Sequence, residues 1–429
     1  MGNFKFAMKM LVKEYKNSLF YCLTLVFAIA VCFIFFNIIN NDLLKDPGAV
    51  SGGVSWQQVK VPFSTSLSFM IICFCCFMIF FANNFFISRK TNEIAIMSLS
   101  GNSSIASTLY LIYQTFTLLI IATPLGIGIG VLVAPLSNYW MYQYLNVEAS
   151  IYQISINTYI ETIVVVAIVL LTLSVFASGY IYRNDIAYLL KQEKAMDYNS
   201  SGSSKIAPIF NVALYILGIV MIFMAEHSSM NYVAPIVVGI AGMVRLIKSF
   251  LPEFIKTFKD KYLLEKRYAL IYFSNLAYSI RRSVLLFSLI AGSVTGMVVI
   301  IATYYNSPRE YITAIIGYIV IVVLLITSIV YKYCLEAQTR ANLFYNLWKI
   351  GYTRSELIKI VNREVFYFYL LLLVVPMIYI VIIIGRFIYY GQMTMMFSCV
   401  LVLIYVIPVI ISGFLTSYNY RKLVIKGGK

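Results

Sequence analysis

The feature that most constrains this chain is a series of ten apolar stretches, each roughly 20 residues long, separated by polar segments. A helix needs about 20 apolar residues to cross the hydrocarbon core of a bilayer. Charged residues make up only 12% of the chain, whereas a soluble domain has about 25%. The sequence therefore predicts an all-α polytopic membrane protein with ten transmembrane helices. The predicted spans are 18–39, 65–87, 108–132, 158–182, 206–225, 232–249, 284–304, 311–334, 365–388 and 393–418.

The distribution of basic residues orients this layout. Of the 33 lysines and arginines, only Lys45, Lys60, Arg309 and Arg386 fall on the outer side when the N-terminus is placed inside. Basic residues are concentrated on the cytoplasmic side of membrane proteins. We therefore expect both termini on the cytoplasmic side of the membrane. The chain has no long polar segment to form a basic soluble face, so nucleic acid is not an expected partner.

Two polar connectors, residues 88–114 and 338–364, follow the second and eighth predicted spans. Gly101 and Gly351 are 250 positions apart, and so are Gln114 and Glu364. Each connector begins with charge, continues with a helical pattern, turns at its glycine and re-enters the membrane. This repetition indicates a diverged duplication. The connectors are either interfacial helices that only link spans, or a paired docking surface for a cytoplasmic partner.

A docking surface would use the residues that share one helical face. Ile94, Met97 and Gly101 have the spacing i, i+3, i+7, and the second connector repeats it with its own apolar pair and glycine. Arg89 and Glu93 are four apart and can pair on a helix. The candidate docking residues are Arg89, Glu93, Ile94, Met97, Gly101, Phe344, Leu347, Gly351 and Arg354.

Other segments have simpler interpretations. Residues 1–17 and 251–283 combine basic and aromatic residues, which is typical of helices lying on an anionic leaflet. Residues 40–64 and 134–157 are expected to be outer loops, and residues 183–205 end in a flexible linker. Glu226 and His227 occupy an outer turn, where a solvated pair is favoured over a proton-coupling pair. Gly126, Gly128 and Gly130 predict close helix packing within the third span.

The chain contains no sequence that supports catalysis. It has no GxxxxGK[ST] phosphate loop, so it has no such site for ATP. With one histidine and few carboxylates, no nucleophile–base pair or metal cluster is evident. We therefore expect no catalytic residue, no metal and no cofactor in this chain. The lack of ionisable groups at mid-membrane favours a protein powered by another subunit.

One segment carries a resemblance to a known family. The sequence EIAIMSLSG, residues 93–101, resembles the EIGILKALG-type segment of FtsX-like ABC permeases of the MacB superfamily. Those proteins carry an acidic residue thirteen positions after the glycine. Glu364 fits that pattern and Gln114 departs from it, while Glu93 fits and Leu343 departs. The ten-span order resembles the bacitracin-efflux-type permeases, but residues 306–310 stand where those proteins have a large extracellular domain.

The resemblance implies a particular organisation and function. Residues 1–183 and 265–429 would be two four-span FtsX-like modules, and residues 184–264 would hold a linker, two extra spans and a basic cytoplasmic segment. The resemblance implies that such a chain is a non-catalytic permease of an ABC transporter in a bacterial plasma membrane, which works by mechanical transmission. Two copies of a cytoplasmic ATPase would hold ATP and Mg²⁺, and membrane lipid would be a further partner.

The cargo is left open by the same resemblance. Antimicrobial-peptide or antibiotic resistance and export are the first expectation. The alternatives are a lipoprotein-release or cell-wall-regulating FtsX-type complex, and a sensory subunit partnered with a histidine kinase.

Overall fold

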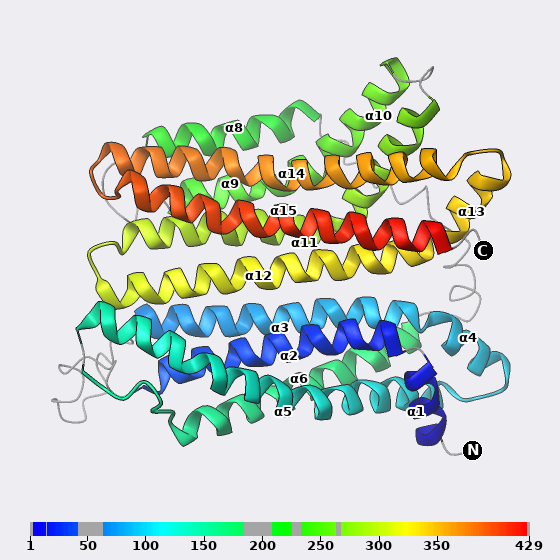
Figure 1. Ribbon diagram of the computed structural model, residues 1–429, viewed down its shortest axis with the longest axis horizontal. Coiled ribbons are helices and arrows are strands. Elements are labelled where there is room, and N and C mark those ends of the chain that lie inside the picture. Colours follow the sequence, from blue (N-terminus) through cyan, green and yellow to red (C-terminus); the bar gives the residue numbers. More distant parts are fainter. Residues whose placement is uncertain are drawn as a thin grey trace. The chain divides into compact units, whose positions relative to one another are not determined.

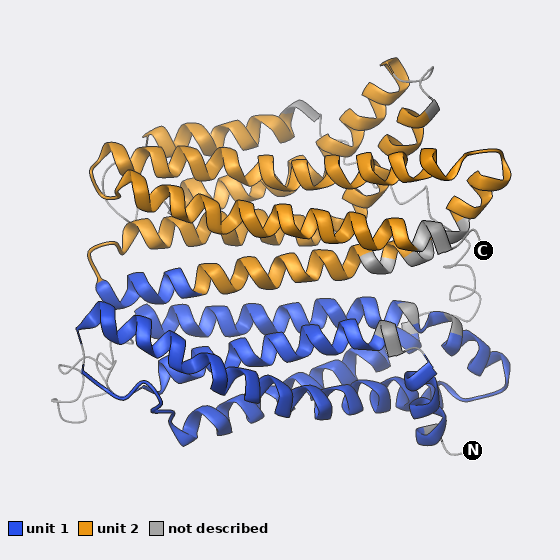
Figure 2. Ribbon diagram, in the orientation of Figure 1, with its two compact units in different colours: residues 1–201, 308–316 blue, residues 202–307, 317–429 orange. Residues whose placement is uncertain are grey.

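The structure is a computed structural model, and it describes residues 3–13, 15–41, 63–146, 148–183, 208–224, 233–262 and 267–426. The outer loop at 42–62, the linker at 184–207 and the turn with Glu226 and His227 lie outside the described residues. The chain divides into two compact units. Unit 1 comprises residues 1–201 and 308–316, and unit 2 comprises residues 202–307 and 317–429 (Figure 2).

All regular elements in the described residues are helices (Figure 1). Those of the first half are α1 (Asn3–Lys13), α2 (Tyr15–Ile39), α3 (Phe63–Arg89), α4 (Thr91–Leu99), α5 (Ser104–Leu145) and α6 (Ile156–Arg183). A second group comprises α8 (Pro208–Met224), α9 (Val233–Arg245), the π-helix η4 (Leu246–Phe250) and α10 (Leu251–Tyr262). The chain continues with α11 (Arg267–Thr303), α12 (Pro308–Thr339), α13 (Ala341–Lys349), α14 (Arg354–Tyr389) and α15 (Met395–Lys426).

The helices confirm a polytopic membrane protein. Among the described residues, nine helices are long and apolar enough to cross a membrane, and they coincide with nine of the ten predicted spans. The remaining predicted span, 206–225, corresponds to α8, which is apolar but only 17 residues long. The helices that carry α4 and α13 extend well beyond the predicted spans. For example, α5 has 42 residues and α14 has 36.

The predicted outer loop 134–157 is largely wrong, because α5 continues as a helix to Leu145. The reason is that Ser137, Asn138 and Tyr142, which follow Ala134, are buried rather than solvated. Asn138 is fully buried, and its side-chain oxygen accepts a 2.9 Å hydrogen bond from Asn37 of α2. Its amide nitrogen donates to the carbonyl of Ile151 at 3.0 Å. These contacts hold the C-terminal end of α5 against α2 and leave a shorter loop between α5 and α6.

Helix α2 forms the centre of unit 1, and small residues bring α5 close to it. A Cβ at Gly126 would lie 2.8 Å from Cβ of Ile29, and one at Gly130 would lie 2.7 Å from the ring of Phe33. At Gly128 a Cβ would have no neighbour within 4 Å. The predicted packing role is therefore confirmed for Gly126 and Gly130, which share a face, and is wrong for Gly128.

The extra helices α8 and α9 pack on α14 within unit 2. The hydroxyl of Tyr379 donates to the carbonyl of Tyr215 at 2.5 Å, and the hydroxyl of Tyr215 donates to the carbonyl of Val375 at 3.1 Å. A Cβ at Gly218 or Gly239 would lie 2.5 Å from the Tyr379 side chain. The extra pair thus lies in the same compact unit as α11, α14 and α15.

Candidate functional site

The two connectors form short helices with the same geometry, α4 in unit 1 and α13 in unit 2. Both helices have nine residues, and both end at a glycine with positive φ, 82° at Gly101 and 101° at Gly351. The amide after each glycine donates back to the carbonyl of Met97 at 3.1 Å or Leu347 at 3.2 Å. This pairing is a Schellman motif, in which glycine avoids the cost of a left-handed side-chain residue.

The helices that re-enter the membrane also begin alike. Ser103 and Thr353, again 250 positions apart, are the N-caps of α5 and α14, each with ψ of 156°. The Ser103 hydroxyl accepts from the backbone N–H of Ala106 at 3.2 Å. Thr353 and Glu356 form a complete capping box. The duplication inferred from glycine spacing therefore extends to the caps and hydrogen bonds of both connectors.

The predicted docking face of α4 is turned inward. Ile94 is fully buried and Met97 is 6% exposed, and both belong to the apolar core of unit 1 with Ala7 and Leu111. In α13, Phe344 is likewise buried, and its ring packs edge-on against Tyr420 with centroids 5.7 Å apart. These side chains attach the connectors to their own units rather than present a contact surface.

Other residues of the connectors face outward. Ile96 and Leu99 of α4 are 63% and 64% exposed, and Trp348 and Ile350 at α13 are 43% and 72% exposed. The positions 96, 99 and 100 and their counterparts 346, 349 and 350 are all exposed. Both connectors therefore present the same side, although its chemistry is apolar in α4 and mixed in α13.

The remaining candidate docking residues have varied placements. The glycines Gly101 and Gly351 are exposed, Leu347 is partly exposed, and Arg354 is exposed at the start of α14. The Arg89 side chain lies outside the described residues, so its pairing with Glu93 stays a prediction. Glu93 forms an ion pair with Lys90, whose Nζ lies 3.0 Å from the carboxylate.

A buried polar cluster lies at the root of α4. It consists of Lys90, Glu93, Tyr110 and Gln114, and we name it the α4 polar cluster. Lys90 is 1% exposed, the Tyr110 hydroxyl donates to Glu93, and the Gln114 amide donates to the Tyr110 hydroxyl at 2.8 Å. The same amide lies 3.3 Å from the carbonyl of Ala7. The cluster thus ties α4 to α5 and to α1.

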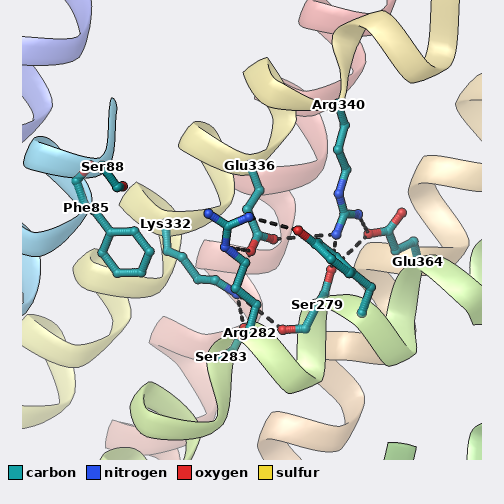
Figure 3. Close-up of polar contacts among 10 residues, drawn as sticks. Phe85, Ser88, Ser279, Arg282, Ser283, Lys332, Glu336, Arg340 and Glu364 are labelled. Atoms are coloured by element: carbon teal, nitrogen blue, oxygen red, sulfur yellow. Dashed lines mark hydrogen bonds and ion pairs between the residues drawn. The ribbon is translucent and has the colours of Figure 1, made fainter. Parts of the chain in front are cut away.

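A more highly charged cluster lies at the root of α13 (Figure 3). Arg340, the residue before α13, donates to the carboxylate of Glu364 at 2.6 Å and to the hydroxyl of Ser279 at 2.9 Å. Its guanidinium is also 3.8 Å from Glu336, which pairs with Lys332 at 3.0 Å. We name these five residues the α13 polar cluster. It joins α11, α12 and α14 to Arg340, the residue before α13.

The α13 polar cluster places charge where charge is costly. Glu364 and Lys332 are fully buried, and Arg340 is 3% exposed. Burial opposes the charge on Arg340, but Glu364 and Glu336 outweigh burial and raise the pKa of its guanidinium well above its ordinary value. A buried ion pair survives only when geometry and extra hydrogen bonds compensate desolvation, and loss of one partner leaves the other stranded. The cluster therefore resists any rearrangement that separates α13 from α11 and α14.

The two clusters occupy equivalent places in the duplicated halves. Lys90 and Arg340 are 250 positions apart, and both are buried basic residues preceding a connector helix. Gln114 and Glu364, the pair singled out by spacing, both face these clusters. In the first half the neutral Gln114 is matched by an acid supplied from α4 itself, Glu93. The departure from the expected acidic residue is thus accompanied by a local replacement.

Two comparisons with known proteins bear on this arrangement. Residues 65–185 match the FtsX-like permease C-terminal family. This FtsX-like segment begins in α3, contains α4, Gly101 and Gln114, and ends after α6. A relative, the uncharacterized ABC transporter permease YvcS of Bacillus subtilis (strain 168), is 28% identical over 189 residues. That alignment covers 44% of this chain and 28% of the relative, so it spans less than a third of the relative's length.

The comparisons support the FtsX-type permease resemblance, and the structure extends it. The FtsX-like segment contains the first connector, and the second connector repeats its turn, caps and buried basic residue at +250. Sequence reasoning missed Arg340, Lys332 and Glu336 as a group. Their spacing of four residues at the end of an apolar span was the available signal, because it places all three on one side of a helix.

Proposed function

We propose that this protein is the membrane subunit of an ABC transporter, and that cytoplasmic ATPase subunits dock on the two connectors. The observation that carries the proposal is the duplicated connector, whose first copy lies inside the FtsX-like segment. Both copies expose the same helical side and bury a polar cluster at the root. A duplicated surface fits a partner that also comes in two copies, so we expect two ATPase chains per permease.

The proposed mechanism is mechanical transmission in a bacterial plasma membrane. The ATPase pair holds ATP and Mg²⁺ and moves the two connectors when it closes. Because the α13 polar cluster links the start of α13 to α11, α12 and α14, a displacement of the connector moves three long helices with it. The α4 polar cluster does the same for α5 and α1. The chain itself contributes no chemistry to hydrolysis.

For the cargo, we propose antimicrobial peptides or antibiotics, on the resemblance of the ten-span order to resistance permeases. Release of lipoproteins, regulation of cell-wall hydrolases, and signalling through a histidine kinase are the competing roles. They are separated by what co-purifies with the chain from its native membrane. An outer-surface protein partner supports the first two roles, and a kinase supports the third.

The docking proposal is tested by charge introduction on the exposed side of each connector. In Ile96→Asp/Leu99→Asp and in Trp348→Asp, we expect the chain to insert normally and to lose stimulation of the co-purified ATPase. Introducing a carboxylate into a buried apolar contact costs several kcal/mol, enough to reduce binding more than 100-fold. Lys422→Asp is the control, since Lys422 is exposed on α15 and lies beyond the predicted span 393–418. Full ATPase stimulation in both connector variants would refute the docking proposal.

A further inference from the structure

Helix α10 leaves the membrane-spanning part of unit 2 in an unusual way. It continues directly from α9 through η4, a five-residue π-helix, and the ribbon turns away from the axis of α14 at the end that carries α13 (Figure 1). Helix α9 and η4 together have 18 residues, and at about 1.5 Å per residue they cover most of a hydrocarbon core of about 30 Å. Helix α10 therefore begins at the depth of the lipid headgroups.

One side of α10 is a continuous row of aromatic rings. Phe250, Phe254, Phe258 and Tyr262 recur every four residues, with successive ring centroids 5.7, 6.1 and 5.4 Å apart. We name these four residues the aromatic stripe. Phe254 is 54% exposed and Tyr262 is 62% exposed. Aromatic rings at such a depth are typical of membrane interfaces, where their apolar bodies leave water.

Positive charge flanks the aromatic stripe. Residues 245–262 contain five basic and two acidic residues. The lysines Lys248, Lys256 and Lys261 are exposed. Lys261 lies over the Tyr262 ring, with Nζ 5.4 Å from the centroid. An apolar stripe bordered by lysines is complementary to an anionic leaflet, which offers acyl chains below and phosphates above.

Helix α10 is attached to α11, at the connector end of unit 2, through two neighbouring residues. Phe258 packs edge-on against Phe273 of α11, and Lys259 donates to the hydroxyl of Ser274 at 3.2 Å. One turn earlier in α11, the hydroxyl of Tyr268 donates to Glu356 in the first turn of α14. The stripe thus touches α11 through Phe258, while Phe254 and Tyr262 on either side of it remain exposed.

We propose that the aromatic stripe and the exposed lysines of α10 form a binding surface for anionic phospholipid headgroups. The surface is separate from the connectors and needs no ATPase, so it stands whether or not the proposed transport function holds. The lysines contact the phosphate and the anionic headgroup, while Phe254 and Tyr262 enter the upper acyl region.

The direct test is lipid binding to the purified full chain. Phosphatidylglycerol and phosphatidylcholine are titrated separately, and bound lipids are counted by native mass spectrometry. We expect phosphatidylglycerol to bind more tightly than phosphatidylcholine, and its affinity to fall in Lys256→Gln/Lys261→Gln by about fivefold for each lysine removed. The preference should weaken as salt is raised, because exposed charges are screened.

A matched variant removes the same charge elsewhere. Lys359→Gln/Lys422→Gln deletes two exposed lysines from α14 and α15, which lack the aromatic stripe, and it should bind phosphatidylglycerol like the unmodified chain. A second variant, Phe254→Ser/Tyr262→Ser, should lose affinity for phosphatidylglycerol while both lysines remain. Equal affinity in all three variants, or no preference for phosphatidylglycerol in the unmodified chain, overturns the proposal.

A photocrosslinker at position 254 identifies the occupant in membranes. The full chain with benzoylphenylalanine at that position is placed in vesicles of about 30% phosphatidylglycerol and about 70% phosphatidylcholine. We expect the lipid adducts to contain a larger share of phosphatidylglycerol than the vesicles do. Adducts formed with another protein in native membranes, in place of lipid, show that the stripe is a protein interface and overturn the proposal.

Discussion

Breaking the ion pair between Arg340 and Glu364 should lower the stability of the chain far more than breaking a surface pair. The guanidinium and carboxylate are 2.6 Å apart, and both side chains are nearly inaccessible to solvent. Removing one partner of a buried ion pair costs about 3–5 kcal/mol, because the remaining charge is left unpaired in a low-dielectric environment. We therefore expect Arg340→Met to lower the free energy of unfolding by about that amount.

Replacing Glu364 in place of Arg340 should lower the free energy of unfolding by a smaller amount. In Glu364→Gln, Arg340 keeps Glu336 at 3.8 Å and the Ser279 hydroxyl at 2.9 Å. We expect a loss of about 1–3 kcal/mol, the cost of a weakened buried hydrogen bond. The double variant Arg340→Met/Glu364→Gln removes both charged groups, so no buried carboxylate at position 364 is left without its partner. Its cost should fall short of the sum of the single costs by about 2 kcal/mol or more.

The assay is unfolding of the purified chain in mixed detergent micelles by titration with sodium dodecyl sulfate. The control is Asp260→Asn, which removes the half-exposed aspartate whose carboxylate lies 3.6 Å from Lys259. Lys259 itself is kept, because it also donates to Ser274. A surface pair of this kind contributes about 0–1 kcal/mol. Single costs at Arg340 and Glu364 that simply add, or that do not exceed that of the control variant, would refute the structural role given to the α13 polar cluster.

Three glycine substitutions and one coupling measurement follow from the same structure. Gly101→Ala should destabilise the chain by about 1–2 kcal/mol in the same micelle assay, because the φ of 82° at Gly101 is strained for alanine. Gly128→Ala should be neutral or stabilising by up to about 1 kcal/mol, because a Cβ at Gly128 meets nothing within 4 Å. Gly239→Ala should loosen α8 and α9 from α14, because its Cβ would lie 2.5 Å from the Tyr379 ring. The readout is proteolysis within residues 208–262, which should be faster than in the control Gly296→Ala, a helical position with open space. Arg340→Met should reduce the ATPase response per bound ATPase without reducing ATPase binding, and loss of binding instead would show that Arg340 acts in docking.

The sequence was sufficient to locate the connectors because their signals are local or strictly periodic. The glycines at 101 and 351 mark αL turns, and their separation of 250 residues predicts two copies of one element. The spans were found because bilayer thickness sets a length that composition reveals. Helix ends were less predictable, as α5 shows, because buried contacts such as that between Asn37 and Asn138 extend a helix past its apolar stretch.

The orientation of the connectors could not be predicted from spacing alone. The pattern selected Ile94 and Met97 as a docking face, but α4 carries apolar residues on both sides. The side with Ile94 and Met97 packs on the core of unit 1, and the side with Ile96 and Leu99 stays exposed, which spacing alone does not decide. The buried cluster around Arg340 was missed for a different reason. Its partners Ser279 and Glu364 come from helices 61 and 24 residues away in sequence. Such pairs depend on how helices pack, which local patterns do not report.

The central claim is that both connectors contact an ATPase, and site-specific crosslinking tests it most directly. Benzoylphenylalanine is placed at position 96 in α4 and at position 350 after α13 in the full chain, which is then irradiated in native membranes. The account predicts that each position yields an adduct with the same ATPase, and that position 94, whose side chain is buried, yields none. Adducts at neither exposed position, with the ATPase captured elsewhere on the chain or absent from the complex, would contradict it.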